Sequence, residues 1–521
     1  MIQNALFLVL SILGLYGLQL FIGYRQGVKN IGNHPGYRTL ISGSSFLGNF
    51  LPPIPGIAPG RNSLFRRKHE DHAKWGWDVI STVSAWPRVR SGYRLADAAV
   101  IKEVTSARAR FPKPVKQYSV LTFFGRNIVA SEGEEWKRYR KITAPSFSER
   151  NNKLVWDETC RIMMDMFDNV WQWKDEISVD HCVDLTLPIA LFVIGVAGFG
   201  RRISWNDDMK VPAGHKMTFK DALHIVSTDV FLKLIVPKWA MGWTERFRNC
   251  QTAFEELREY MLEMIRARRT AEKKEERYDL FSSLLDASED DSDGEAKLAD
   301  EELLGNIFIF LVAGHETTAH TLCYVFGLLA LYQDEQEILY QHIKSVIPDG
   351  RIPTYEEMNK FTQSMAVFYE TLRLYPPVPA IPKQSAEDTT LTVSNAYGEK
   401  TVIPVPAGTD LVIATPALHY NPRYWEDPHA FKPARFLEKD WPRDAFLPFS
   451  AGARACIGRR FFETEGIAIL TMLVAKYKIE VKEEPQFAAE TFEQRRERLL
   501  ANRPGLTLTP LRVPLVFKRR V

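Results

Sequence analysis

The sequence predicts a mainly α-helical protein with small β-sheets, an α+β fold, preceded by one N-terminal membrane-spanning helix. Helical patterns, amphipathic or continuously apolar, recur over residues 157–173, 255–269 and 301–331. Beyond Arg373 the pattern changes to short apolar runs separated by Pro and Gly, which is typical of strands. Residues 401–403 and 410–413 flank a Pro-Ala-Gly turn at 406–408, and this arrangement predicts a hairpin. We therefore expect a small sheet beside a helical body.

The N-terminal apolar run covers residues 5–22, which is just long enough to cross a bilayer as a helix. Arg25 and Lys29 follow the run and no Lys or Arg precedes it, so the positive-inside rule leaves the rest of the chain in the cytosol. A cleaved signal peptide is the alternative, but a cationic start and a small-residue cleavage site are not clear here. We predict an anchor over residues 1–23, a Pro/Gly-rich linker over 24–60 and a folded body over 61–521.

Composition narrows the class of protein. The formal net charge is +3 and the basic residues are dispersed, so we expect no nucleic acid partner. Five cysteines are an odd number without close pairing, which argues against a disulfide framework and indicates a reducing compartment.

One cysteine lies in an unusual loop, where residues 449–458 read Phe-Ser-Ala-Gly-Ala-Arg-Ala-Cys-Ile-Gly. Gly452 and Gly458 permit a tight turn and a close approach to a flat group, and Arg454 places a cation two residues from the sulfur of Cys456. A buried structural cysteine is the alternative interpretation. A thiolate here could instead bind haem iron, and thiolate ligation favours O–O bond cleavage.

This loop closely resembles the haem-binding loop of the cytochrome P450 family, in which Phe, Gly, Arg, Cys and Gly recur at the separations of Phe449, Gly452, Arg454, Cys456 and Gly458. The resemblance implies the cytochrome P450 fold, with residues 61–521 as one haem-thiolate monooxygenase catalytic domain. It also implies a haem b cofactor whose iron is axially ligated by Cys456. The N-terminal architecture is similar to that of membrane-anchored fungal members.

The apolar pattern of residues 301–331 is interrupted by a polar segment, Ala-Gly-His-Glu-Thr-Thr, at 313–318. One alternative is a zinc site, because the segment almost spells the metalloprotease helix motif. However, His315 and His320 are five residues apart and would diverge by roughly 140° around a helix. A second membrane span is also possible, but a central Glu and two His make it costly.

The same segment resembles the oxygen-binding helix of the cytochrome P450 family. The small residues Ala313 and Gly314 would leave space for dioxygen, and the Thr317 hydroxyl could turn toward the carbonyl of Ala313. Oxygen activation also requires protons, which Glu316 and Thr317 could relay through water. Together with Cys456, these two residues are the predicted catalytic set.

A second motif places Glu370 and Arg373 three residues apart on one helical face, where they can pair. A lone pair of this kind is usually an ordinary surface ion pair. Here a Tyr-Pro-Pro-Val-Pro run at 375–379 ends the helix, and Arg435 lies upstream of the cysteine loop, both as in the family. The resemblance implies that the three residues form a buried structural network behind the haem.

The haem propionates require cations or hydrogen-bond donors, and Arg454 is the first candidate. Trp136 and Arg140 match the family's Trp-x-x-x-Arg helix and are spaced to face one side. Lys383 falls where many relatives carry arginine, so its contact lacks the bidentate fork of a guanidinium. For the substrate pocket we predict a lid over residues 111–130 and a set of apolar side chains: Phe123, Phe124, Ile309, Phe310, Val378, Ala380 and Ile381.

The resemblance implies a monooxygenase that uses O2 and receives electrons from NADPH through a separate cytochrome reductase. It further implies a single-pass protein of the endoplasmic reticulum membrane whose catalytic domain faces the cytosol. An apolar terpenoid of secondary metabolism is the expected substrate, with xenobiotics, fatty acids and sterols as alternatives. A reductase-independent haem-thiolate isomerase or dehydratase is the alternative from another class, and a non-enzymatic haem sensor is a third.

Overall fold

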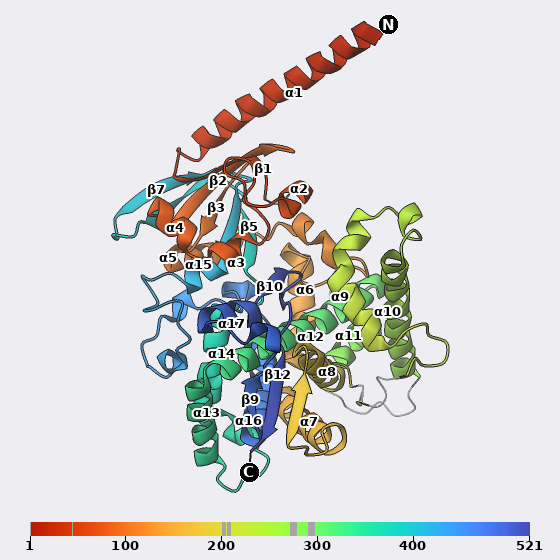
Figure 1. Cartoon of the computed structure of the whole chain (residues 1–521). Coiled ribbons are helices and arrows are strands. Elements are labelled where there is room, and N and C mark those ends of the chain that lie inside the picture. The colour runs from red at the N-terminus through yellow and green to blue at the C-terminus, as the bar shows by residue number, and fades with distance from the viewer. Residues whose placement is uncertain are drawn as a thin grey trace. The chain divides into compact units, whose positions relative to one another are not determined.

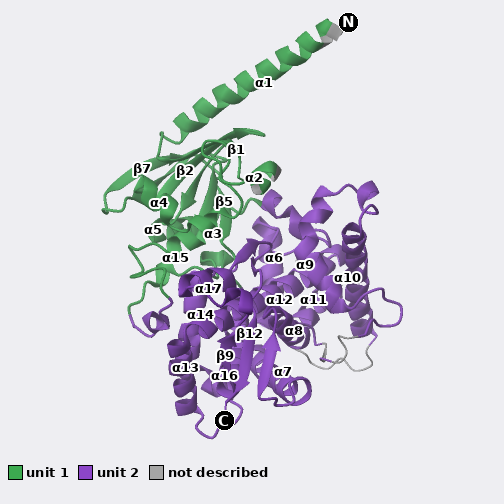
Figure 2. Ribbon diagram, viewed as in Figure 1, with its two compact units in different colours: residues 1–114, 378–430, 440–456 green, residues 115–377, 431–439, 457–521 purple. Residues whose placement is uncertain are grey.

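The computed structural model describes residues 2–43, 45–200, 205, 210–270, 279–289 and 297–520, and Figure 1 shows the arrangement of its elements. The chain divides into two compact units (Figure 2). Unit 1 comprises residues 1–114, 378–430 and 440–456, and unit 2 comprises residues 115–377, 431–439 and 457–521. The folded body that we predicted as one domain is therefore built from two compact units.

Unit 1 contains a five-stranded mixed sheet with the strand order β1-β2-β3-β8-β5. Its elements in chain order are α1 (Ile2–Asn30), β1 (Gly36–Ile41), α2 (Phe46–Phe50), α3 (Ser63–Arg67), α4 (Glu70–Trp75), β2 (Val79–Trp86), β3 (Arg90–Leu95), α5 (Ala98–Ser106), β5 (Ala380–Gln384), β6 (Thr389–Ser394), β7 (Lys400–Val405), β8 (Asp410–Ala414) and α15 (Thr415–His419).

Unit 2 is the helical body. Its helices are α6 (Gly133–Thr143), α7 (Glu149–Asp165), α8 (Val183–Val193), α9 (Phe219–Ile235), α10 (Glu245–Arg269), α11 (Leu280–Glu289), α12 (Asp300–Leu331), α13 (Gln333–Val346), α14 (Thr362–Leu374), α16 (Arg459–Lys476) and α17 (Phe492–Leu499). Its strands are β4 (Glu176–Val179), β9 (Tyr477–Val481), β10 (Asn502–Pro504), β11 (Leu508–Pro510) and β12 (Leu515–Arg519). The mainly helical α+β class is thus confirmed.

Helix α12 is the centre of unit 2. It is 32 residues long and buried on most sides, because α8, α10, α14 and α16 pack around it. The helix therefore carries apolar side chains on most of its sides and lacks the single apolar stripe of a surface helix. A carboxylate-rich first turn, Asp300 to Glu302, lies at the positive end of the helix dipole.

The predicted N-terminal helix is confirmed and extends further than expected. The segment Leu6–Asn30 of α1 is long and apolar enough to cross a membrane. No residue in its most apolar stretch is buried against the rest of the protein. The range 24–60 is more structured than the linker we predicted, because it holds the last turns of α1 and the strand β1, which pairs in parallel with β2. Within it, residues 51–60 form no helix, as their prolines require, and contain one isolated bridge between Ile54 and Ala58.

The predicted hairpin between residues 401–403 and 410–413 is wrong. Gly408 does form a turn with φ +81°, but β7 pairs with β6 while β8 pairs with β3 and β5 in the larger sheet. The actual hairpin joins β6 and β7, where the side-chain oxygen of Asn395 accepts hydrogen bonds from the backbone N–H groups of Tyr397 and Glu399. Long-range pairing in the sheet therefore overrides the local turn signal.

Candidate active site

The Cys456 loop is folded by backbone hydrogen bonds within unit 1. The N–H of Cys456 donates to the carbonyl of Phe449 at 2.9 Å, and the N–H of Ala455 donates to the carbonyl of Gly452 at 3.0 Å. Gly452 has φ +66°, and a Cβ at this position would overlap the carbonyl oxygen of Thr105 at the end of α5. Glycine is therefore required here by both conformation and close approach. Gly458 differs, since a Cβ there would make only an ordinary contact with Phe147.

The thiol of Cys456 is exposed, whereas the other four cysteines are buried. This exposure excludes the alternative of a buried structural cysteine. Sequence reasoning missed His419 of α15, whose Nε2 accepts a hydrogen bond from the N–H of Leu447 at 2.8 Å and so fixes the start of the loop. The ring of His419 also stacks on Phe446, 5.7 Å away. No local pattern around His419 could have indicated this contact.

In α12, the bond that we predicted for Thr317 is present. Its hydroxyl donates to the carbonyl of Ala313 at 2.9 Å. Ala313 is exposed and Gly314 and Thr317 are half-buried, although most of the residues before and after them along this helix are buried. The middle of α12 therefore presents a small open face that carries one hydroxyl group.

Glu316 lies next to this face and is almost completely buried. Its Oε2 has no hydrogen-bond partner among the residues that the structure describes. Burial disfavours the charged form and raises the pKa of the Glu316 carboxyl to about 8, while the charge of Arg503 opposes the shift. Glu316 is therefore largely a neutral carboxylic acid at pH 7 and can donate a proton.

Gly314, the second of the two small residues, is closely packed in the direction of a side chain. A Cβ at this position would lie 2.8 Å from Cγ1 of Ile194, which follows α8. The position that a Cβ would take at Gly314 is thus occupied by the Ile194 side chain, while the residue itself is half-buried. Its role in leaving space for dioxygen stays a prediction. Of the two small residues, Ala313 is the one on the exposed face.

The two histidines of α12 bond to different partners. Nδ1 of His315 lies 2.7 Å from the carbonyl of Leu311, and Nδ1 of His320 lies 2.7 Å from the hydroxyl of Thr507. Burial lowers the pKa of His315 to about 4 and that of His320 to about 3. Both rings are therefore neutral at pH 7 and are held by hydrogen bonds of their own.

The pairing of Glu370 with two arginines is present in unit 2. Nε and Nη2 of Arg373 donate to the two carboxylate oxygens of Glu370 at 2.7 and 2.8 Å. Nε of Arg435 and the backbone N–H of Lys432 donate to Oε1 of the same carboxylate, at 3.2 and 2.9 Å. Because Glu370 and Arg373 are completely buried, this is an interior ion cluster and not the surface pair of the alternative interpretation.

The candidate propionate ligands come from three elements. Trp136 is buried and Arg140 is half-buried, one turn later on α6. Arg454 is half-buried in the short helical turn at Gly452–Arg454. Lys383 is buried in β5, and its backbone lies opposite that of Leu411 in the antiparallel pairing of β5 with β8.

The predicted pocket residues differ in exposure. Phe124 is buried in an aromatic cluster with Phe254 and Phe308, and Phe123 packs edge-on against Phe254 at 5.3 Å. Ile309 and Phe310 are buried, and Phe310 contacts Phe147. In unit 1, Val378 is exposed, whereas Ala380 and Ile381 are half-buried in β5.

Sequence reasoning missed the residues that fix the predicted lid to α12. The side-chain oxygen of Asn306 accepts a hydrogen bond from the N–H of Ile128 at 3.0 Å. A Cβ at Gly125 would overlap the carbonyl oxygen of Glu301, and one at Gly305 would overlap that of Arg126. The end of the 111–130 segment is therefore packed directly on the helix backbone. The two glycines were the available signal, but their partners are far apart in sequence.

An exposed cysteine on a glycine-dependent loop, and an acid beside a hydroxyl on a buried helix, are features expected of haem-thiolate oxygenases. The chain belongs to the cytochrome P450 family, whose model matches residues 83–507. It is 60% identical over 520 residues to cytochrome P450 monooxygenase 124 of Postia placenta, covering 99% of this chain and 100% of that protein. It is 33% identical to cytochrome P450 monooxygenase ORF6 of Penicillium roqueforti, covering 82% of this chain and 79% of the relative.

The solved heme domain of cytochrome P450DA has the same fold, with a TM-score of 0.74 at 20% identity over 94% of this chain and 98% of that one. The protein is therefore a cytochrome P450 monooxygenase and a haem-thiolate enzyme. Its residues fit the cofactor, because the Cys456 thiol is accessible and the Ala313 face of α12 is open.

Proposed function

We propose that this monooxygenase hydroxylates an apolar organic substrate, a terpenoid of secondary metabolism, with electrons that a separate reductase transfers from NADPH. The oxygenase chemistry is supported by two neighbouring residues of α12: Thr317, whose hydroxyl is oriented at the open face, and Glu316, a largely neutral acid buried beside that face. The substrate class is supported by a Streptomyces melanosporofaciens relative named cyclooctat-9-en-7-ol 5-monooxygenase, 29% identical over 68% of this chain. A relative from the phomenoic acid biosynthesis cluster of Leptosphaeria maculans, 25% identical over 74% of this chain, supports secondary metabolism.

In this proposal, Cys456 supplies the thiolate ligand of the haem iron. The bound haem supplies oxygen activation, with electron density donated by the sulfur. The backbone of Phe449 and the turn at Gly452 hold the thiol in position, and Gly458 opens the following helix. The side chains proposed for the propionates are Arg454, Trp136, Arg140 and Lys383.

Proton delivery is assigned to Glu316 and Thr317. Glu316 is neutral at pH 7 and has an O–H to donate, because burial raises its pKa to about 8. The Thr317 hydroxyl is oriented by its bond to the Ala313 carbonyl, and its lone pairs can accept a hydrogen bond from water. The pair can therefore hold and transfer a proton at the exposed face. The Glu370 cluster, with Arg373 and Arg435, has a structural role only.

The apolar side chains Phe123, Ile309, Phe310, Val378, Ala380 and Ile381 are proposed to contact the substrate. Phe124 is proposed to line the same pocket, and both Phe123 and Phe124 pack on Phe254. Surfaces of this kind bind by burying apolar area and therefore suit a substrate with few polar groups.

The cellular location is proposed from α1. Residues 1–23 are the proposed anchor in the endoplasmic reticulum membrane, with Arg25 and Lys29 on the cytosolic side and the folded body as the catalytic domain in the cytosol. Deletion of residues 1–23 should release the protein from membranes while its haem spectrum is kept. Loss of the haem spectrum would contradict an anchoring role.

The test of the haem and oxygenase assignments uses the spectrum and the origin of the product oxygen. The reduced parent enzyme with carbon monoxide should show the strongly red-shifted Soret band of a thiolate ligand, and Cys456→Ser should lose that band. A histidine-type spectrum in the parent would refute the ligand assignment. When NADPH and reductase are present, labelled oxygen from O2 should appear in a terpenoid product. Turnover in the absence of both NADPH and reductase would support an isomerase or dehydratase.

A further inference from the structure

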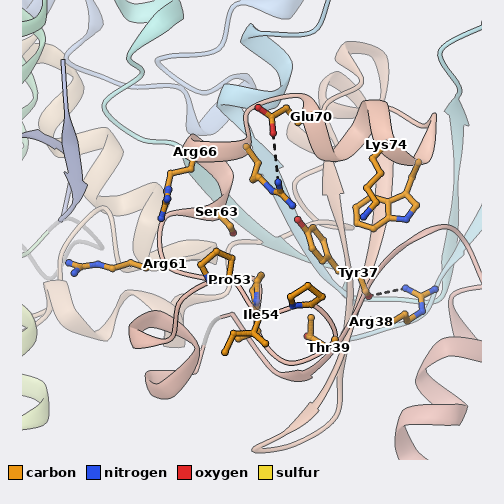
Figure 3. A pocket seen from close by; sticks show the side chains of 16 residues that line it. Tyr37, Arg38, Thr39, Pro53, Ile54, Arg61, Ser63, Arg66, Glu70 and Lys74 are labelled. Carbon is orange, nitrogen blue, oxygen red and sulfur yellow. Dashed lines mark hydrogen bonds and ion pairs between the residues drawn. The ribbon is translucent and has the colours of Figure 1, made fainter. Parts of the chain in front are cut away.

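Unit 1 contains a cavity of about 580 Å³ beside the first strand of its sheet (Figure 3). Its walls are formed by β1, the proline-rich loop at 53–61 and the helices α3 and α4. The volume lies within the range of roughly 300 to 1,000 Å³ that is usual for small-molecule sites. The monooxygenase reaction assigned above uses none of these residues, so the cavity needs its own explanation.

The lining of this cavity is strongly cationic. Glu70 is its one lining carboxylate, and the five lining cations are Arg38, Arg61, Arg66, Arg67 and Lys74. Hydroxyl groups of Tyr37, Thr39 and Ser63 also line it. Such a lining attracts a ligand that carries more than one negative charge.

Not all of these cations are compensated by the protein. Arg67 pairs with Glu70 at 3.8 Å and with Asp71 at 3.3 Å, and Arg38 donates to the carbonyl of His34. By contrast, the side chains of Arg61 and Arg66 form no ion pair or hydrogen bond within the part of the chain that the structure describes. Figure 3 shows both at the same edge of the cavity. Two guanidinium groups are therefore available to an external anion.

The segments that carry the lining residues, and the helix α2 that follows β1, also expose large apolar side chains. Leu40 is 53% exposed, Phe50 is 64% exposed and Ile57 is 39% exposed. Hydrogen bonds hold the strand to the loop here, from the N–H of Leu40 to the carbonyl of Gly56 at 2.8 Å and from that of Ile41 to Ile57 at 2.7 Å. Exposed apolar residues beside cations are the pattern of surfaces that insert into the interface of an anionic membrane.

The cavity belongs to the unit that carries the membrane helix. β1 begins at Gly36, soon after α1 ends at Asn30. The turn between β2 and β3 lies against α1, because the hydroxyl of Tyr16 donates to the carbonyl of Pro87 at 2.9 Å and Val89 packs on Gly23 and Gly27. Anchoring by α1 would therefore hold this sheet, with its cationic cavity, at the membrane surface.

We propose that this cavity binds the phosphorylated headgroup of an anionic membrane lipid. A phosphate monoester can accept bidentate hydrogen bonds from guanidinium groups, and the nearby hydroxyls can donate to its remaining oxygens. A zwitterionic headgroup would leave the excess positive charge unbalanced. The proposal uses the membrane anchoring by α1 but does not depend on the oxidation reaction or its substrate.

The test measures binding to the full haem-loaded chain in nonionic detergent. The probes are short-chain soluble phosphatidylinositol 4-phosphate, short-chain phosphatidylcholine and inorganic phosphate, each titrated calorimetrically. We expect saturable binding of the phosphoinositide, at least about tenfold tighter than either comparison ligand. Equal binding of inorganic phosphate would overturn the lipid assignment in favour of a simple anion site, and absence of phosphoinositide binding would overturn the site.

The variant Arg61→Ala/Arg66→Ala should weaken phosphoinositide binding by about tenfold or more. Its matched control is Arg88→Ala/Lys400→Ala, which removes two exposed cations from the same unit outside the cavity. An equal loss in the control would show general charge attraction and refute a specific cavity. The carbon monoxide spectrum and circular dichroism report whether each variant is folded, and Arg61→Lys/Arg66→Lys should retain intermediate affinity. A failure of the proposed oxidation would leave these binding results unchanged.

Discussion

Two buried carboxyl groups of unit 2 have opposite surroundings. Glu370 accepts hydrogen bonds from Arg373, Arg435 and the backbone of Lys432, so its negative charge is compensated. Glu316 is equally enclosed, but its Oε2 has no partner among the described residues. Since an uncompensated charge is costly in the interior, burial raises the pKa of the Glu316 carboxyl to about 8 and leaves it largely neutral at pH 7.

This difference separates scaffold from chemistry. A compensated cluster resists change and holds α14 to the segment around Arg435, which is the short helical turn at Pro433–Phe436. A neutral acid next to an exposed helix face can give up a proton and take it back. The cluster should therefore govern stability, and Glu316 with Thr317 should govern turnover.

The largest expected effect is on stability, from Arg373→Ala. Removal of this guanidinium takes away both hydrogen bonds that the fully buried Arg373 donates to Glu370 and leaves the contacts with Arg435 and the Lys432 N–H. Breaking this buried ion pair should lower the free energy of unfolding by about 3 to 5 kcal/mol. Denaturant unfolding followed by circular dichroism measures it.

The control for this variant is Arg351→Ala, because Arg351 forms a bidentate pair with Glu357 at 2.7 and 2.8 Å on the surface. That change should cost less than about 1 kcal/mol. Similar losses in the two variants would mean that burial of the Glu370 cluster does not set its contribution.

The sequence was sufficient for those parts of the site that depend on local spacing. Glu370 and Arg373 are one helical turn apart, and Thr317 reaches a carbonyl four residues earlier, so both bonds follow from helix geometry. The mainly helical class and the N-terminal apolar helix were predictable for the same reason, since each is a pattern within one continuous segment.

Most contacts between distant segments were not predictable, and the contact of Arg435 with Glu370 was expected only from the family resemblance. Ile194 fills the space at Gly314, His419 binds the start of the cysteine loop, and Asn306 holds Ile128. The hairpin prediction failed likewise, because β8 pairs with β3 and β5 of the larger sheet instead of with β7. No periodicity records such partners, which depend on how the whole chain packs.

Glu316→Gln should remove the pH dependence of stability that this carboxyl imposes. Its pKa is raised from 4.5 to about 8 in the folded protein, so its favourable contribution is complete below pH 4.5 and is lost as the pH rises through about 8. The amide of Gln stays neutral at every pH. Relative to the parent, the variant should therefore gain stability between pH 4.5 and 8, on the order of a few kcal/mol.

Unfolding free energies measured across this pH range provide the test, with Glu301→Gln on the exposed first turn of α12 as the control. A parent-minus-variant difference that does not change with pH would show that the Glu316 carboxyl is ionised in the folded state.

Thr317→Ala should affect turnover with little effect on stability. The haem spectrum should be kept, but product formed per NADPH consumed should fall roughly tenfold or more, because proton delivery loses its hydroxyl and reducing equivalents appear as peroxide. Thr317→Ser keeps the hydroxyl and should retain most of the coupling. If both variants lost coupling equally, the methyl group and not the hydroxyl would be the important part of the side chain.

Gly314→Ala tests a third kind of position, where the neighbouring group is a closely packed apolar side chain and not a charged one. The new methyl group would lie 2.8 Å from Cγ1 of Ile194, so the free energy of unfolding should fall by about 1 kcal/mol, even though alanine favours the helix. The same change in an Ile194→Ala background should cost nothing, and a double-mutant cycle would measure this coupling. If the stability were unchanged and the NADPH coupling were lost, Gly314 would be assigned to the oxygen site beside Ala313.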